Sequence, residues 1–212
     1  MFSDQPIIAR LIWLALACVM AVAVFQARWS LGFVAGATLV LSLTPVLVAR
    51  LADIKVPASF VVAVVMFVGG TLFLGEVLDF YERFWWWDIA MHGGSAVAFG
   101  LIGFVLVFMM FQGDRFAAPP FAMAIFAFAF ALAIGTLWEV FEFSMDHLFG
   151  LNMQKSGLMD TMGDLVVNSV GALIGAGSGY VYLKEREHGG LTGLIDEFVR
   201  RNPRLFRRGR RK

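Results

Sequence analysis

The chain alternates between six long apolar stretches and short polar or aromatic joints. The apolar stretches cover residues 7–25, 30–49, 59–78, 88–111, 121–143 and 162–183. Each is close to the roughly 20 residues that a helix needs to cross a bilayer. Lipid offers the backbone no hydrogen-bond partners, so such stretches are helical, and a membrane β-barrel would alternate apolar and polar residues instead. The pattern predicts an all-α, polytopic membrane protein built as a six-helix transmembrane bundle.

The composition agrees with this fold class. Of the 212 residues, 59% are hydrophobic and 16% are charged, with a mean hydropathy of +0.77. Soluble domains are about 45–50% apolar and about 25% charged. So much apolar surface excludes the soluble, disordered and disulfide-rich secreted classes. The single cysteine, Cys18, lies inside an apolar stretch, so neither a disulfide framework nor a cysteine metal cluster is expected.

Charge divides the chain near residue 184. Residues 184–212 hold ten Lys and Arg against four Asp and Glu, whereas residues 1–183 hold seven against twelve. An excess of Lys and Arg marks the cytoplasmic side, and an even number of spans puts both termini there. We therefore expect a multi-pass protein of the bacterial inner (cytoplasmic) membrane with both termini in the cytoplasm. It divides into a six-span transmembrane domain (1–183) and a basic cytoplasmic tail (184–212).

The tail contains an amphipathic helix followed by a basic run that ends at Lys212. Such a helix lies on an anionic leaflet. The expected partners are therefore membrane lipids, with anionic inner-leaflet lipid at the basic tail, and not nucleic acid. The apolar face of this helix consists of Leu191, Leu194, Ile195, Phe198 and Val199.

Small residues recur along the sixth span. Gly171, Gly175 and Gly179 follow one another at four-residue spacing, which lets membrane helices approach closely. They bring this span against a helix of the same subunit or against a second copy of the chain in a homo-oligomer.

Three spans carry polar residues at helical spacing. Residues three or four apart share one helix face, and the topology places the three polar stripes at a similar depth on the outer side. Ionisable side chains within spans normally face the interior of the bundle. We therefore expect them to converge in one outer-facing cavity. The stripes are Asp88 and His92; Glu139, Glu142 and Asp146; and Asp160, Asp164 and Asn168.

These side chains suit a divalent metal ion. Neighbouring carboxylates repel unless they are protonated or bridged by a cation, and oxygen donors with one imidazole suit Mg²⁺, Mn²⁺, Fe²⁺ or Zn²⁺. His92 or Glu139 is the expected general base, with Asp146 at the rim of the cavity and Asn168 at its floor. A purely structural role stays open for single members, because Asp88 and Asp160 can each cap a span. The expected metal ligands are Asp88, His92, Glu139, Glu142, Asp160 and Asp164.

Three segments resemble the YjdF-type family of uncharacterised bacterial inner-membrane proteins: FWWWDIAMHGGSA (84–96), GTLWEVFEFSMD (135–146) and GLNMQKSGLMDTMGDLVVNSVGA (150–172). The resemblance spans residues 70–180 and implies a polytopic membrane fold with a shared polar constellation.

A weaker similarity is to the VanZ-like family, which is linked to teicoplanin resistance. It rests on Asp-x3-His in one span and on Asp164, Asn168, Gly171 and Gly175 in another. That family tends to show Glu-x2-Gln and then an Arg, whereas this chain has two glutamates and no Arg in 135–183. A shared substrate therefore does not follow.

Three function classes fit the polar set. In the first, the protein is a membrane-embedded metal enzyme that hydrolyses or transfers a lipid or envelope precursor. In the second, the site is a purely structural cluster of polar side chains, with or without a metal ion, in a membrane assembly or partner-binding protein. In the third, the stripes line an ion or proton path, although matching acids do not occur in the inner halves of the spans. The sequence does not decide whether the protein is an enzyme.

Overall fold

The computed structural model describes residues 5–111, 118–185 and 189–206. Within these ranges, six helices are long and apolar enough to cross a membrane: Ile7–Phe25, Trp29–Leu51, Ala58–Val77, Trp87–Phe111, Pro120–Phe149 and Leu158–Lys184. The prediction of an all-α polytopic membrane bundle is confirmed. The fifth span continues beyond its predicted end to Phe149, and the sixth begins earlier than predicted, at Leu158.

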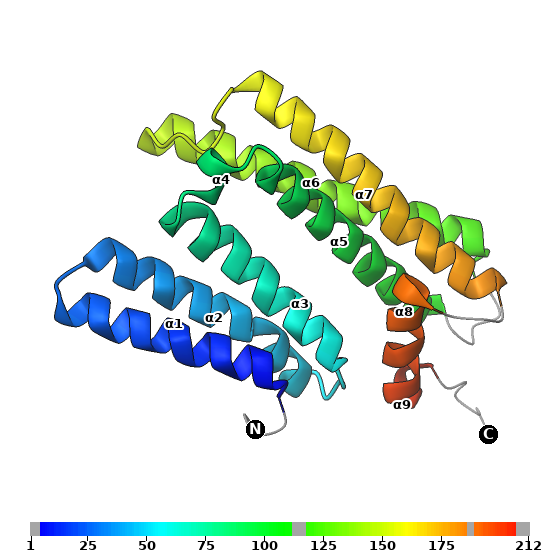
Figure 1. Ribbon diagram of the computed structural model, residues 1–212. Coiled ribbons are helices and arrows are strands. Elements are labelled where there is room, and N and C mark those ends of the chain that lie inside the picture. The colour runs from blue at the N-terminus through cyan, green and yellow to red at the C-terminus, as the bar shows by residue number, and fades with distance from the viewer. Residues whose placement is uncertain (1–4, 112–117, 186–188, 207–212) are drawn as a thin grey trace. The chain divides into compact units, whose positions relative to one another are not determined.

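The chain forms two compact units, one up to Met91 and one from His92 onward; Figure 1 shows their helices. The first unit contains α1 (Ile7–Phe25), α2 (Trp29–Leu51), α3 (Ala58–Val68), the π-helix η1 (Gly69–Val77), α4 (Phe80–Arg83) and the beginning of α5. The indole Nε1 of Trp13 donates a hydrogen bond to Ser42 Oγ (3.1 Å), which satisfies both polar groups inside the unit. The core of this unit consists of Ala9, Trp13, Val46, Val61 and Val65.

The second unit contains most of α5 (Trp87–Phe111), with α6 (Pro120–Phe149), α7 (Leu158–Lys184), α8 (Gly190–Arg201) and α9 (Pro203–Phe206). α6 begins at Pro120, where a missing N–H breaks no helical hydrogen bond. It ends at Gly150, whose φ of 68° is left-handed and favours glycine. The connection 150–157 then turns the chain back, so that α6 and α7 lie side by side and antiparallel (Figure 1).

α7 packs against α5 through its glycine face. A Cβ atom added to Gly171 would lie 2.6 Å from the carbonyl oxygen of Gly93, and one added to Gly175 would collide with the carbonyl oxygen of Val97. Gly179 continues the same face. The glycines therefore allow direct contact between the two backbones. Of the two partners that the sequence left open for this face, a helix of the same subunit covers it.

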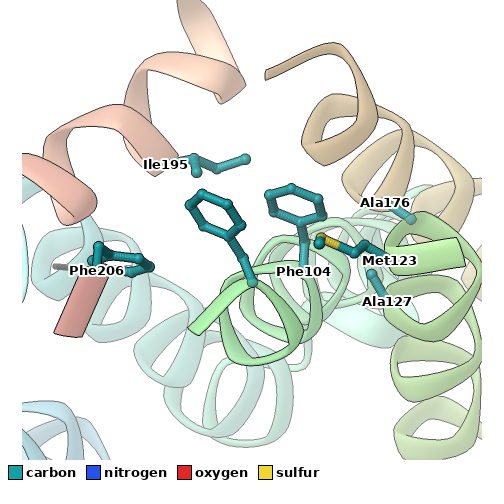
Figure 2. Close-up of a cluster of buried hydrophobic side chains, with 7 residues drawn as sticks. Phe104, Met123, Ala127, Ala176, Ile195 and Phe206 are labelled. Carbon is teal, nitrogen blue, oxygen red and sulfur yellow. The ribbon is translucent and has the colours of Figure 1, made fainter. Parts of the chain in front are cut away.

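The tail helix α8 contributes to a core at one end of the second unit (Figure 2). Ile195 is only 2% exposed, and Phe198 and Val199 pack against the same cluster. Three of the five residues of the apolar face that was expected to lie on the leaflet thus contact the bundle, because aromatic rings offer them a protein partner. Association of the basic run with anionic lipid stays a prediction. The buried members of the cluster are Phe104, Phe108, Met123, Ala127, Ala176, Ile195 and Phe206.

Replacing Gly175 by alanine should destabilise the protein, because the added Cβ meets α5 backbone that cannot rotate away. We expect a loss of about 1–3 kcal/mol, the range for overpacking. Gly177→Ala is the matched control, since nothing lies within 4 Å of its added Cβ, and alanine favours helix. Thermal unfolding in detergent compares the two variants. Equal unfolding temperatures would show that the α5–α7 contact is looser than described.

Replacing Ile195 by alanine should also lower the unfolding temperature, because it empties a fully buried site between α8 and the bundle. Deleting such a side chain costs about 2–5 kcal/mol. Leu194→Ala serves as the control, since Leu194 lies outside the cluster and is only partly buried. If both variants unfold like the parent protein, α8 does not pack on the bundle in detergent.

Candidate metal centre

Three helices bring polar side chains, most of them ionisable, into the interior of the second unit. α5 carries His92, α6 carries Glu139 and Glu142, and α7 carries Asp164 and Asn168. Each of these five residues is 9% exposed or less. These five members of the predicted stripes face the interior, as expected for ionisable groups in membrane spans, whereas Asp88, Asp146 and Asp160 are partly exposed.

The glycine face of α7 explains why its acid points to α5. Asp164, Asn168, Gly171 and Gly175 are three or four residues apart and therefore share one side of the helix. Because the glycines touch the α5 backbone, the polar residues of the same stripe must face α5 as well. His92 meets them from α5, one residue before the Gly93 carbonyl that Gly171 approaches.

The imidazole of His92 lies between side chains of α6 and α7. Its Nδ1 atom is 3.7 Å from Oε1 of Glu139 and 3.4 Å from Nδ2 of Asn168. Its Nε2 atom is 3.8 Å from Oδ2 of Asp164. The two edges of the ring therefore face two different carboxylates, one from each neighbouring helix.

Asp88 completes a group of three side chains that could hold a metal ion. It lies one turn before His92 on α5, and one ligand atom each from Asp88, His92 and Asp164 lie within 4.8 Å of one another. Two ligands bound to one cation at 2.0–2.6 Å are at most about 4–5 Å apart. Small side-chain movements therefore suffice for the three atoms to reach one cation. An imidazole with two carboxylates suits Mg²⁺, Mn²⁺, Fe²⁺ or Zn²⁺.

Glu139 and Glu142 lie on α6, outside this group of three. Glu139 approaches the other edge of His92. Oε1 of Glu142 accepts a hydrogen bond of 2.9 Å from the indole Nε1 of Trp138, one turn earlier on the same helix. Both glutamates were expected as metal ligands, but the geometry brings neither into the group that Asp88 and Asp164 form.

Asp146 and Asp160 hold the connection between α6 and α7. Asp146 accepts hydrogen bonds from the backbone N–H groups of Met153 (2.7 Å) and Gln154 (2.8 Å). Asp160 accepts one from the N–H of Lys155 (3.2 Å) and is partly exposed. Asp160 was expected among the metal ligands. Its observed contact is not the helix cap that the sequence left open either, because Gly157 is the N-cap residue of α7 and no side chain caps it.

Sequence reasoning overlooked Gly135. A Cβ atom at this position of α6 would lie 2.8 Å from Nδ2 of Asn168, so the glycine makes the space that the asparagine fills. The signal was available, because Gly135 lies four residues before Glu139 and therefore on the same stripe of the helix.

Fold and site together define a polytopic membrane protein with a histidine–carboxylate group inside its helices. Residues 8–185 match the family described as Predicted membrane protein (DUF2238), and the chain belongs to this family. The YjdF-type resemblance is compatible with that assignment, whereas the VanZ-like similarity stays a prediction.

The chain also resembles one protein of unknown function. An uncharacterized protein of Thermotoga maritima is 30% identical over 102 residues, which are 46% of this chain and 50% of the relative. The chain thus matches about half the length of that relative. No solved structure matches the chain.

Proposed function

We propose that the protein binds one divalent cation within the membrane through Asp88, His92 and Asp164. The observation that carries this proposal is the grouping of their ligand atoms within 4.8 Å. Burial of His92 and Asp164 supports it, because charged side chains inside a span are costly and neighbouring carboxylates repel each other. A divalent cation offsets both effects. Mg²⁺, Mn²⁺, Fe²⁺ and Zn²⁺ match the donors.

Hydrolysis or transfer of a lipid or envelope precursor is the reaction class that fits this centre best. The ligands lie on membrane-spanning helices, so a substrate with an apolar tail can approach through the bilayer. A divalent cation held there would supply Lewis acidity to a phosphate or carbonyl oxygen. His92, as a ligand, uses one ring nitrogen for the cation and keeps a proton on the other. It therefore does not also serve as the general base.

A structural metal site is the second candidate, and the loop contacts favour it. Asp146 and Asp160 fix the α6–α7 connection by binding its backbone, and a cation between α5 and α7 would stabilise the same bundle. In this case the protein acts as a membrane assembly or partner-binding protein. The two candidates share the metal and differ in whether the metal-loaded protein turns over a lipid.

We also propose that the protein lies in the bacterial inner membrane with both termini in the cytoplasm. Fourteen Lys and Arg then lie on the cytoplasmic side against three outside, namely Arg28, Arg83 and Lys155. The basic tail lies where anionic lipid of the inner leaflet is available.

Asp164→Asn should abolish stoichiometric metal binding, because the amide keeps the shape of the side chain but removes one anionic ligand. Asp79→Asn is the control: Asp79 is exposed beside Arg83 and has a left-handed φ of 56° that asparagine tolerates. Metal content is measured by elemental analysis of detergent-purified protein after loading with each of the four cations.

Loading should give one metal ion per chain in the parent protein and in Asp79→Asn. Chelation should lower the unfolding temperature of both, since a ligand that binds only the folded state stabilises it. The proposal fails if the parent protein retains none of the four cations, or if Asp164→Asn retains as much as the control.

The orientation predicts that two reporters, placed on opposite sides of the membrane, are both active. Green fluorescent protein attached after Lys212 should fluoresce, and alkaline phosphatase inserted in the 150–157 connection should be active, because this enzyme needs the oxidising periplasm. The reverse pattern would place the histidine–carboxylate group on the cytoplasmic side.

A further inference from the structure

We infer that Glu139 is the residue that positions His92 for metal binding and is not itself a ligand. This inference rests on the proposed metal centre. It starts from the two edges of the imidazole, since Nε2 faces Asp164 at 3.8 Å and Nδ1 faces Glu139 at 3.7 Å. A cation shared with Asp164 lies at the Nε2 edge of the imidazole, and Glu139 then lies at the opposite edge, beside Nδ1.

The chemistry of a metal-bound imidazole assigns a role to a carboxylate beside Nδ1. Only a nitrogen without a proton can bind the cation, so the other nitrogen carries the proton. A carboxylate that accepts this N–H fixes the tautomer, orients the ring and makes the ligand more basic. With Nε2 on the cation, Nδ1 carries the proton of His92 and Glu139 is the carboxylate beside it. A small movement brings the 3.7 Å separation to about 2.7–2.9 Å, the length of a charge-assisted hydrogen bond.

Packing around α6 keeps Glu139 in this place. A Cβ atom added to Gly103 of α5 would lie 3.2 Å from the Cα of Ala127, so the α5 and α6 backbones are in contact. One turn before Glu139, Gly135 receives the side chain of Asn168 from α7. Glu139 itself is 4% exposed. The carboxylate therefore faces the imidazole from a helix that both neighbours hold.

Asn168 lies at the same edge of the ring and offers an internal test. Its side-chain amide lies 3.4 Å from Nδ1 of His92, and the residue is 1% exposed. An amide nitrogen only donates, so a proton on Nδ1 requires Asn168 to turn its Oδ1 toward the ring. Aspartate has the same shape as asparagine, so Asn168→Asp places a carboxylate beside Nδ1 from a different helix. If the role of Glu139 is to accept the Nδ1 proton, a carboxylate at residue 168 should replace it.

The experiment measures Mn²⁺ affinity and stoichiometry by electron paramagnetic resonance on the full chain in detergent. Glu139→Gln should still bind one Mn²⁺, with a Kd raised about 10–100-fold, the usual effect of losing such a carboxylate. The double variant Glu139→Gln/Asn168→Asp should recover most of that affinity. Asp164→Asn, which removes a ligand, should bind no Mn²⁺. A purely structural contribution of Glu139 would not be restored by a carboxylate on α7.

Three results overturn the inference while leaving the metal centre intact. The first is that Glu139→Gln binds Mn²⁺ as tightly as the parent protein. The second is that Glu139→Gln loses Mn²⁺ completely, as Asp164→Asn does. The third is that the double variant binds Mn²⁺ no better than Glu139→Gln. If the parent protein itself binds no Mn²⁺, Mg²⁺, Fe²⁺ or Zn²⁺, the proposed function fails first. Should Glu139→Gln not fold, ¹⁵N resonances of His92 in the Zn²⁺-loaded parent protein decide. A proton on Nδ1 supports the inference, and a proton on Nε2 contradicts it.

Discussion

Direct contact between the α5 and α7 backbones is the constraint on which the histidine–carboxylate group depends. Gly171 and Gly175 lie against the carbonyl oxygens of Gly93 and Val97, so rigid main chain and not flexible side chains sets the separation of the helices. His92 adjoins this contact, and Asp164 lies two turns from it on the same face. Their separation of 3.8 Å is therefore a property of the helix pair. Without the glycines, the helices would move apart and the two side chains with them.

The membrane explains why the polar residues are confined to one side of each helix. A span that carries Asp164 and Asn168 on one face must offer lipid a purely apolar face on the other, and α7 does so. This arrangement inverts the amphipathic pattern of a soluble helix, in which the apolar side is buried. On α7 the buried side consists of small and polar residues, and the exposed side consists of Val166, Val170, Leu173 and Ile174.

Sequence reasoning predicted the six spans and the inward stripes because both follow from local periodicity. Span length reflects bilayer thickness, and the side of a helix follows from spacing of three or four residues. The packing of Ile195 into the cluster that contains Phe104 was not predictable in this way. An amphipathic helix beside a basic run fits a lipid surface and a protein surface equally well. Only the three-dimensional position of the aromatic rings distinguishes the two.

The same limit applies inside the polar set. Helical spacing places Asp160 and Asp164 on one face and cannot separate them, yet their surroundings differ because Asp160 adjoins the α6–α7 connection. Backbone N–H groups of that connection are donors without helical partners, and the nearest acids accept from them. Hence Asp160 binds the N–H of Lys155, whereas Asp164, one turn deeper, meets His92.

The acids that bind the α6–α7 connection also affect the geometry of the histidine–carboxylate group. Asp146 and Asp160 bind backbone N–H groups between the two helices, and so fix how far α6 can slide along α7. That register sets the height of Glu139 relative to Asp164, and with it which carboxylate faces which edge of His92. If α6 slid along α7 by one turn, about 5.4 Å, Glu139 would move away from Nδ1 of His92. A different side chain of α6 would then face Nδ1. The acids that bind only backbone are thus as necessary to the geometry of the imidazole as the acids that face it.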